Sequence, residues 1–249
     1  MKIRFIINPV AGAGKQKNIH ILIKKFIKHP YELLYTKERG DATILSKQAV
    51  KEAVAIVVAV GGDGTVNECA KELIDSNTAL GVIPCGSGNG FAYHFGMNKN
   101  IPEAVKQLNM CKITVIDSCT ANNERFVNVS GIGFDAHIAN LFTNINKRGF
   151  VNYLRLIAKE LSYKPKTYKL EYEGKVIEVK AYLIAFANAS QYGNNAMISP
   201  LASARDGLID FVIVKSFPKW KIPVLLFNIA KGKTHLSIHI NIIRAKKLK

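Results

Sequence analysis

The fold of this chain is decided by one stretch, Val54-Ala55-Ile56-Val57-Val58-Ala59-Val60-Gly61-Gly62-Asp63-Gly64-Thr65-Val66-Asn67-Glu68. Its first half, residues 55–60, is a run of small and β-branched apolar residues without polar alternation, which is typical of a parallel strand covered on both faces. The glycines interrupt this run, and apolar residues then recur at helical spacing as Val66, Cys69, Ala70, Leu73 and Ile74. The stretch therefore predicts a buried strand, a tight turn and a helix, the repeating unit of an open α/β layer.

The same alternation extends over the first half of the chain. Strands are expected at residues 2–7, 31–35, 55–60, 80–83 and 112–116, and helices at 19–27, 42–53 and 66–74. Beyond residue 117 the expected strands are longer and follow one another more directly, at 125–130, 167–173, 176–187, 209–214 and 236–242, with helices near 134–142, 150–161 and 220–230. We therefore expect an α/β N-terminal domain with a Rossmann-like open sheet over residues 1–117, and a mainly antiparallel β-sandwich domain over residues 118–249.

Length, composition and charge exclude several classes of protein. With 249 residues, of which 48% are hydrophobic, the chain can fold without disulfides or a structural metal. No apolar run reaches the ~18 residues that a membrane span needs, and the four cysteines form no Cys-x-x-Cys pair. The formal net charge is +17, and residues 140–249 carry 19 basic against 6 acidic side chains. The second domain should therefore present a positive face, which attracts anionic lipid or nucleic acid.

Three Gly-rich loops follow expected strands, and each could hold a phosphate. They are Asn8-Pro9-Val10-Ala11-Gly12, Gly61-Gly62-Asp63-Gly64-Thr65 and Pro84-Cys85-Gly86-Ser87-Gly88-Asn89-Gly90. Glycines between a strand and a helix let backbone N–H groups approach an anion, and such loops at neighbouring strand ends define a crevice. A carboxylate at Asp63 beside phosphate predicts a metal ion or a substrate hydroxyl between them, as phosphoryl transfer requires. The simpler alternative is that Asp63 only caps the following helix together with Thr65.

Two other nucleotide-binding motifs fit less well. Pro9 occupies the position of the first glycine in a Walker A loop, and Gln16 replaces the Ser or Thr that would bind Mg²⁺. Gly131-Ile132-Gly133-Phe134-Asp135-Ala136 matches the dinucleotide-binding pattern, but no βαβ unit follows it and no acidic residue ends a strand about 20 residues later. We expect these glycines to permit close packing or to line a substrate wall.

Taken together, the loops resemble one family. Asn8-Pro9 with Gly12, the loop with Gly61-Gly62-Asp63-Gly64-Thr65 and Asn67-Glu68, and the loop at 84–89 occur in the order and spacing of diacylglycerol kinase catalytic domains, as do Gly133-Phe134-Asp135-Ala136 and Asp206-Gly207-Leu208-Ile209-Asp210. Over nearly its whole length the chain is similar to the bacterial lipid kinases of this family, which are related to sphingosine and ceramide kinases and have an NAD kinase-like fold. The family usually has Arg at the position of Tyr93, and it continues past the equivalent of Lys249 into a segment with an Asp-Gly-Glu motif. We therefore expect this chain to lack the family's C-terminal segment.

The resemblance implies ATP and Mg²⁺ as cofactors and assigns their sites. The Mg²⁺ site would combine the Asp206 side chain with main-chain oxygens of Ser203 and Leu208, and oxygen ligands of this kind suit Mg²⁺. Asp63 would be the catalytic residue that polarises the attacking hydroxyl. The nucleotide-binding residues would be Asn8, Pro9, Val10, Ala11, Gly12, Thr36, Gly61, Gly62, Gly64, Thr65, Val66, Asn67, Glu68, Gly86, Ser87, Gly88 and Asn89.

The function that the resemblance implies is transfer of the γ-phosphate of ATP to a hydroxyl of diacylglycerol or of a sphingoid- or ceramide-type lipid. The protein would act in lipid metabolism from the cytoplasm, held peripherally on the inner face of the membrane by its basic half, with Phe134, Phe142, Phe150, Tyr153 and Met197 as candidate walls of a lipid pocket. A homodimer could form through an exposed strand edge.

Three alternatives to a lipid kinase stay open. An NAD kinase would share the Gly-Gly-Asp-Gly-Thr motif, and a truncated lipid- or nucleotide-binding protein would keep the loops without turnover. A basic nucleic-acid-binding protein would explain the charge, but the basic residues form no recognition helix and no regular aromatic interleaving, so we expect no nucleic-acid partner.

Overall fold

The structure is a computed structural model that describes residues 2–14, 16–110, 112–143, 150–160 and 162–249, without the side chains at 13, 142, 143, 150, 151, 153 and 154. The chain divides into two units, Met1–Val115 with Glu124–Val127, and Ile116–Asn123 with Asn128–Lys249. The short strands β5 (Cys119–Ala121) and β6 (Glu124–Phe126) lie where the chain passes between the units. The candidate pocket residues Phe142, Phe150 and Tyr153 have side chains outside the described part.

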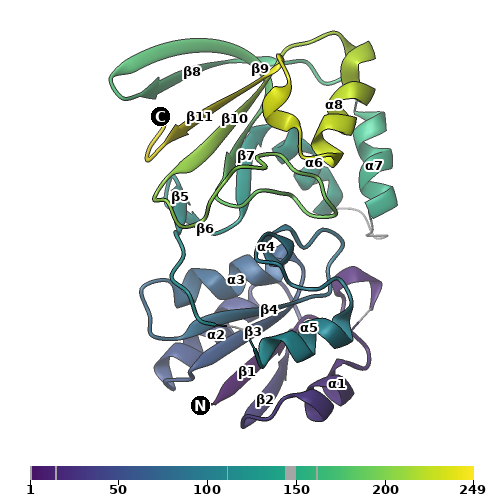
Figure 1. Ribbon diagram of the computed structural model, residues 1–249, viewed down its shortest axis with the longest axis vertical. Coiled ribbons are helices and arrows are strands. Elements are labelled where there is room, and N and C mark those ends of the chain that lie inside the picture. Colours follow the sequence, from purple (N-terminus) through teal and green to yellow (C-terminus); the bar gives the residue numbers. More distant parts are fainter. Residues whose placement is uncertain (1, 15, 111, 144–149, 161) are drawn as a thin grey trace. The chain divides into compact units, whose positions relative to one another are not determined.

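A parallel sheet of four strands forms the centre of the first unit. The strands β1 (Ile3–Ile7), β2 (Tyr31–Tyr35), β3 (Ile56–Gly61) and β4 (Ala79–Pro84) lie in the order β2-β1-β3-β4. Helices α1 (Ile19–Phe26) and α5 (Ile101–Leu108) lie on one side of the sheet, and α2 (Asp41–Lys51) and α3 (Asp63–Leu73) lie on the other (Figure 1). The short helices η1 (Ala11–Ala13) and α4 (Gly90–His94) follow β1 and β4. Because the strands are parallel, their carboxyl ends meet at one edge of the sheet.

Both faces of this sheet are buried, but in different ways. Phe5, Val58 and Val60 pack with α1 and α5 in an apolar cluster. Arg4, one position along β1 and 3% exposed, lies on the opposite face because side chains alternate along a strand. Its guanidinium donates to Glu32 (2.6 Å), to Glu52 (2.5 Å) and to the carbonyl of Leu45 (3.2 Å). This arginine therefore ties β1 to β2 and to the end of α2.

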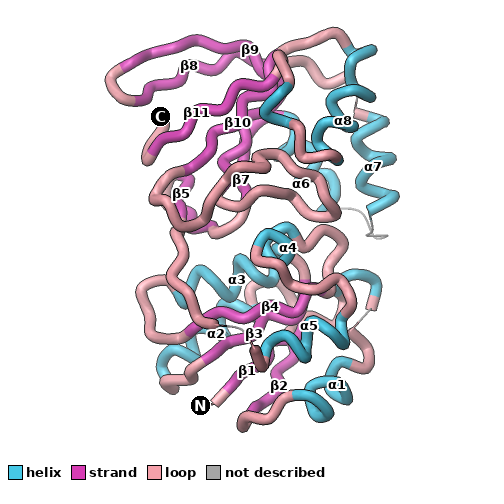
Figure 2. Tube along the Cα trace, in the orientation of Figure 1, coloured by secondary structure: helices cyan, strands magenta, loops and turns pink. Residues whose placement is uncertain are grey.

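The second unit contains a mainly antiparallel sheet, in which the strands β7 (Val129–Gly133), β9 (Lys175–Ala187), β10 (Ile209–Lys215) and β11 (Ile240–Ala245) lie in the order β11-β10-β9-β7. The long strand β9 pairs with β10 on one edge, while β7 and β8 (Lys166–Tyr172) share its other edge. Glu173 and Gly174 join β8 to β9 with φ of 48° and 72°, which suits a type I′ hairpin turn. Helices α6 (Phe134–Thr143), α7 (Phe150–Lys159) and α8 (Ile222–Ala230) gather at one end of the sheet (Figures 1 and 2).

The expected fold class is confirmed, with a parallel α/β first half and a mainly antiparallel second half. Three strand predictions need correction. Residues 112–118, all of them described, form no strand, because Ile113 and Val115 are exposed and the parallel sheet ends at β4. The strand expected at 125–130 is divided between β6 and β7. The alternating residues 236–242 begin in the 3₁₀ helix η3 (Thr234–Leu236), so β11 starts only at Ile240 and leaves Leu236 and Ile238 exposed.

Candidate active site

The three Gly-rich loops of the first unit contact one another at the carboxyl edge of the parallel sheet. The backbone N–H of Asn8 donates to the carbonyl of Val60 (3.0 Å), which joins the loop after β1 to β3. The backbone N–H of Cys85 donates to the carbonyl of Gly61 (2.9 Å), which joins β3 to the loop after β4. The sheet therefore brings together the loops that were expected to hold phosphate.

Two glycines allow these loops to approach so closely. A Cβ atom on Gly12 would lie 1.8 Å from the carbonyl oxygen of Cys85, and the φ of +53° at Gly12 also disfavours other residues. A Cβ atom on Gly86 would lie 2.4 Å from the Cα of Gly62. At both positions the neighbouring atom belongs to the backbone, so only glycine fits the observed path of the chain.

The loop after β4 is closed by Asn89. This residue is 5% exposed and has a left-handed backbone (φ 62°). Its Oδ1 accepts from the backbone N–H of Gly86 (2.7 Å), and its Nδ2 donates to the carbonyl of Gly86 (2.9 Å) and to the hydroxyl of Tyr93 (3.2 Å). The amide of Asn89 therefore holds Ser87 and Gly88 in a tight loop, and Tyr93 supports that amide from α4.

Asp63 lies between the loop after β3 and the start of α4. Its Oδ1 accepts from the backbone N–H of Phe91 (3.0 Å). Burial raises the pKa of the Asp63 carboxyl, against the lowering effect of backbone N–H groups at Phe91, Gly90 and Asn89. Asp63 is the first residue of α3 and Gly62 is its N-cap. The simpler alternative expected Asp63 to cap the helix that follows it. In the structure, the Asp63 carboxylate instead contacts the N-terminus of a different helix, α4.

The first turn of α3 is tied to the loop after β1 through Thr65. The Nδ2 of Asn8 donates to the Oγ1 of Thr65 (3.1 Å). The side chain of Val66 is 2% exposed, and its backbone N–H already donates to the carbonyl of Gly62 (3.0 Å). It therefore packs the core and supports the loop, while the earlier N–H groups of α3 have no acceptor within the helix.

The remaining residues of the expected nucleotide set lie at different depths. Thr36 is buried, and its backbone N–H donates to the carbonyl of Ile7 (2.9 Å) at the end of β1. Glu68 turns toward the loop before α2, where its Oε2 accepts from the backbone N–H of Gly40 (3.2 Å). Pro9 and Val10 are exposed, Ala11 is buried, and Gly64 and Asn67 lie on α3. Thr36 thus lies at the carboxyl end of β1, and Glu68 contacts the segment that precedes α2.

The residues expected to hold Mg²⁺ share one turn of the second unit. The Oγ of Ser203 accepts from the backbone N–H of Arg205 (3.3 Å), and the Oδ1 of Asp206 accepts from the backbone N–H of Leu208 (3.1 Å). The Oδ2 of Asp117 accepts from the backbone N–H of Gly207 (2.9 Å) and thereby adds a second carboxylate beside the turn. Two carboxylates and main-chain carbonyls are a donor set that fits Mg²⁺. Sequence reasoning took Asp117 only as a domain boundary and missed this contact.

A second carboxylate of the second unit was also missed. Asp135 lies in the first turn of α6, which follows β7 directly. Its Oδ1 accepts from the backbone N–H of Ala136 (2.7 Å), and its Oδ2 accepts from the hydroxyl of Tyr192 (3.0 Å). Burial raises the pKa of Asp135 to about 6. A Cβ atom on Gly131 would lie 2.3 Å from that carboxylate, which confirms that this glycine permits close packing. The Gly-x-Gly-x-x-Ala pattern was the available signal in the sequence, and in the structure it contains a half-buried carboxylate at Asp135.

Known proteins match this chain over both units. The diacylglycerol kinase catalytic domain matches residues 2–121, and the YegS C-terminal NAD kinase beta sandwich-like domain matches residues 128–249. The chain is 32% identical over 196 residues to a Chromohalobacter salexigens protein named probable lipid kinase YegS-like, a match that covers 76% of this chain and 63% of the relative. It is 29% identical over 223 residues to a diacylglycerol kinase of Bacillus subtilis, which covers 85% and 73%. The chain therefore spans less than two thirds of the first relative's length.

A solved structure shows the same likeness in three dimensions. The crystal structure of a diacylglycerol kinase from Bacillus anthracis matches with a TM-score of 0.75 at 28% identity, covering 99% of this chain and 84% of that one. The likeness includes both the parallel and the antiparallel sheet, because nearly all of this chain is covered.

Proposed function

Because this chain belongs to the diacylglycerol kinase family, we propose that it is a lipid kinase that transfers the γ-phosphate of ATP to a lipid hydroxyl with the help of Mg²⁺. The observation that carries the proposal is the contact of three Gly-rich loops at one edge of the parallel sheet, beside the Asp63 carboxylate. Such an edge offers backbone N–H groups and a helix N-terminus to the phosphates of a nucleotide.

The nucleotide would lie along residues 8–12, with its phosphates on the first turn of α3 and on the loop closed by Asn89. Each part has support in a contact already described: the Asn8–Thr65 hydrogen bond links the first two loops, and the Gly86–Gly62 approach links the second and third. The cradle is preorganised, because these contacts form within the protein and require no rearrangement around the phosphates.

The turn with Ser203, Asp206 and Leu208 would hold Mg²⁺, with Asp117 beside it. Asp206 is exposed, so its carboxylate is accessible to a cation, and its Oδ1 is oriented by the N–H of Leu208.

Asp63 would accept the proton of the attacking lipid hydroxyl. The N–H groups at the start of α4 orient its carboxylate, and burial raises its pKa, which makes it a stronger base than an exposed aspartate. An Asn at this position keeps the shape and one acceptor oxygen but loses the basic group. We therefore expect Asp63→Asn to lower kcat by about 10²–10⁴-fold with little change in ATP affinity.

The experiment that tests the proposed function offers separate acceptors to one enzyme preparation. The chain is incubated with Mg²⁺ and γ-labelled ATP together with diacylglycerol, sphingosine, ceramide or NAD, and the label in each product is counted. We expect label in a lipid. Label in NAD alone would contradict the lipid assignment and favour an NAD kinase, and no transfer to any acceptor despite ATP binding would contradict the kinase proposal itself.

The matched control for Asp63→Asn is Asp75→Asn in the same unit. Asp75 is exposed and has a left-handed backbone (φ 64°), which Asn tolerates well, and it forms a long ion pair (3.4 Å) with Arg125. Isothermal titration with ATP separates binding from turnover. Equal turnover by the two variants would remove Asp63 from the proposed mechanism.

A further inference from the structure

Helix α8 carries an apolar face that is largely exposed to solvent in the described part of the second unit. None of its nine residues is buried, although eight of them are apolar in the sequence Ile-Pro-Val-Leu-Leu-Phe-Asn-Ile-Ala. We use the name α8 surface for five exposed apolar residues of this helix, of the preceding η2 (Lys219–Lys221) and of the segment after it: Trp220, Val224, Phe227, Leu236 and Ile238. Trp220 is 74% exposed and Ile238 is 80% exposed. Val224 and Phe227 are three residues apart and share one side of α8. Trp220, Leu236 and Ile238 line the same hollow as Val224, so the α8 surface is one patch.

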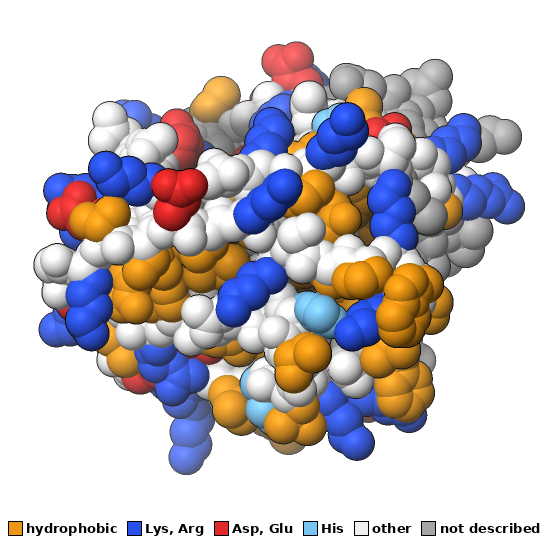
Figure 3. Space-filling model, turned by 90° about the horizontal axis from the view of Figure 1, so that it is seen from above, with side chains coloured by type: hydrophobic (Ala, Val, Ile, Leu, Met, Phe, Trp, Pro, Cys, Tyr) orange, Lys and Arg blue, Asp and Glu red, His pale blue; other side chains and the backbone are white. Residues whose placement is uncertain are grey.

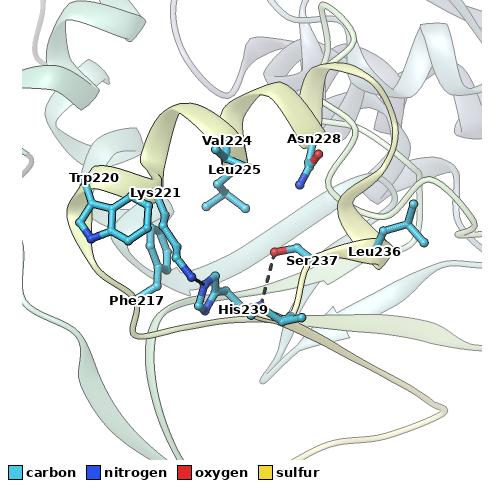
Figure 4. Close-up of a pocket in the computed structure, with 10 residues that line it drawn as sticks. Phe217, Trp220, Lys221, Val224, Leu225, Asn228, Leu236, Ser237 and His239 are labelled. Carbon is cyan, nitrogen blue, oxygen red and sulfur yellow. Dashed lines mark hydrogen bonds between the residues drawn. The ribbon is translucent and has the colours of Figure 1, made fainter.

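The patch is held firmly on the body of the unit. Leu225 packs against the apolar cluster on one face of the antiparallel sheet, and the carbonyl of Ile229 accepts from the backbone N–H of Met197 (3.1 Å). The fully buried hydroxyl of Thr234 donates to the carbonyl of Met197. Figure 4 shows Val224 and Leu225 of α8 on one side of a hollow of about 270 Å³, with Leu236 and Ser237 on the other. The exposed side chains therefore project from a supported helix.

Lysines surround this apolar patch, and acidic residues are absent from the whole segment. Residues 211–249 contain nine Lys and Arg residues and no Asp or Glu. The Nζ of Lys221 lies 5.3 Å from the centre of the Trp220 ring, and the Nζ of Lys231 lies 6.0 Å from the centre of the Phe227 ring. Figure 3 shows apolar and Lys side chains intermingled on the face seen from above. Lysines beside exposed aromatic rings can place their stems along apolar atoms and their charges at a polar boundary.

This combination fits an anionic bilayer better than a second copy of the chain. A two-fold interface would bring the same patch from both copies together, and Lys219, Lys221, Lys231 and Lys233 would then face one another without a carboxylate from residues 211–249. Anionic lipid headgroups supply the missing negative charge, while the acyl region accepts Trp, Phe and aliphatic side chains. No described helix is long and apolar enough to cross a membrane.

We propose that the α8 surface docks on the surface of an anionic phospholipid bilayer, with Trp220, Val224 and Phe227 inserted at the boundary between headgroups and acyl chains. The proposal rests on the proposed function for its purpose, which is to bring a lipid kinase to a substrate that resides in the bilayer. Docking itself is a separate property and can be measured without ATP.

Trp220 is the only tryptophan in the chain, so its fluorescence reports directly on docking. With vesicles of phosphatidylglycerol and phosphatidylcholine, we expect the emission of the wild-type chain to shift to shorter wavelength and to be quenched by brominated acyl chains. Vesicles of phosphatidylcholine alone should bind much more weakly. An emission spectrum that does not change with anionic vesicles would overturn the proposal.

Two sets of variants separate the apolar and the electrostatic contributions. Phe227→Ser should weaken binding to anionic vesicles because it removes an inserted ring. Replacing Lys219, Lys221, Lys231 and Lys233 with Gln should lower the partition constant by about fivefold for each lysine near the bilayer. The matched control replaces the exposed lysines 24, 25, 47 and 51 of the first unit and changes the net charge equally. Equal binding of the two charge variants to anionic vesicles would mean that binding depends only on net charge. That result would overturn the assignment of docking to the α8 surface.

Two further measurements distinguish the other outcomes. If the α8 surface joins two copies, sedimentation velocity should show a dimer that Phe227→Ser dissociates, which would contradict docking on lipid. Kinase activity on a short-chain, water-soluble diacylglycerol should survive in Phe227→Ser, while activity on vesicle-borne substrate falls. If the wild-type chain inserts Trp220 but phosphorylates no lipid, the docking proposal is supported and the proposed function is contradicted. If it phosphorylates a lipid without inserting Trp220, the proposed function is supported and the docking proposal is contradicted.

Discussion

Replacing Asp135 with Asn should remove a pH-dependent loss of stability from the second unit. Its carboxylate is half-buried in the first turn of α6 and accepts from Ala136 and Tyr192. Burial raises its pKa from an ordinary 3.8 to about 6, so the folded chain keeps this proton over a pH range in which the unfolded chain releases it. Below that range both states are protonated, and above it both are ionised. Stability should therefore fall as pH rises from about 4 to about 6.

The size of this loss follows from the shift in pKa. Each unit corresponds to about 1.4 kcal/mol, so a rise from 3.8 to about 6 gives about 3 kcal/mol. Asn is neutral at every pH and its Oδ1 can still accept from Tyr192. The wild-type chain should lose about 3 kcal/mol of unfolding free energy through this group as pH rises from about 4 to neutral, and Asp135→Asn should lack that loss.

Urea unfolding followed by far-UV circular dichroism measures the free energy of unfolding, and a transition that changes in Asp135→Asn is assigned to the second unit, which contains Asp135. Unfolding free energies measured at intervals from acid to neutral pH give the slope for each variant. The control is Glu178→Gln, which removes an exposed carboxylate from β9. If Asp135→Asn and the wild-type chain show parallel pH dependence, then Asp135 does not titrate in this range and the reasoning from burial is wrong.

Two other predictions concern contacts within single units. Gly86→Ala would place a methyl group 2.4 Å from the Cα of Gly62 and 2.8 Å from the Oδ1 of Asn89, so isothermal titration should show ATP binding weakened by at least about tenfold. Unchanged affinity would mean that the loops are not needed at this spacing. Arg244→Met leaves the buried carboxylate of Asp210 without its ion pair (2.7 Å) and should lower the unfolding free energy by about 3 kcal/mol, measured by urea unfolding. A loss below about 1 kcal/mol would contradict this reading of the pair.

The sequence predicted those elements that a local pattern of neighbouring residues determines. The strand β3 was predicted because an uninterrupted apolar run of that length is buried on both faces in a parallel sheet. The loops at its end and after β4 were found because glycines cluster there, and parallel strands then bring them to one edge. The strand expected at 236–242 was only half right, because alternation records spacing and does not show whether a ladder partner exists; β10 pairs no farther than Ile240.

The contacts that orient the candidate site could not be predicted in the same way. Asp63 meets the N–H of Phe91, 28 residues later, and Asn8 meets Thr65, 57 residues later. These pairs depend on how α4 and the loops pack in three dimensions, which no local pattern in the sequence records. Asp117 was missed for the same reason, since its partner Gly207 is 90 residues away. The sequence therefore identified these residues as polar groups, but it could not identify their hydrogen-bond partners.

The glycine contacts at the carboxyl edge of the parallel sheet also limit how this site can vary over evolution. At Gly61 an added methyl group would meet the side chain of Thr65, and a smaller residue at that neighbour could restore the fit. At Gly12 and Gly86 the obstacle is the backbone of Cys85 and of Gly62, which no substitution can make smaller. A screen for second-site suppressors should therefore recover compensating changes for Gly61 and none for the other two glycines. Those two positions are fixed individually, whatever the rest of the sequence becomes.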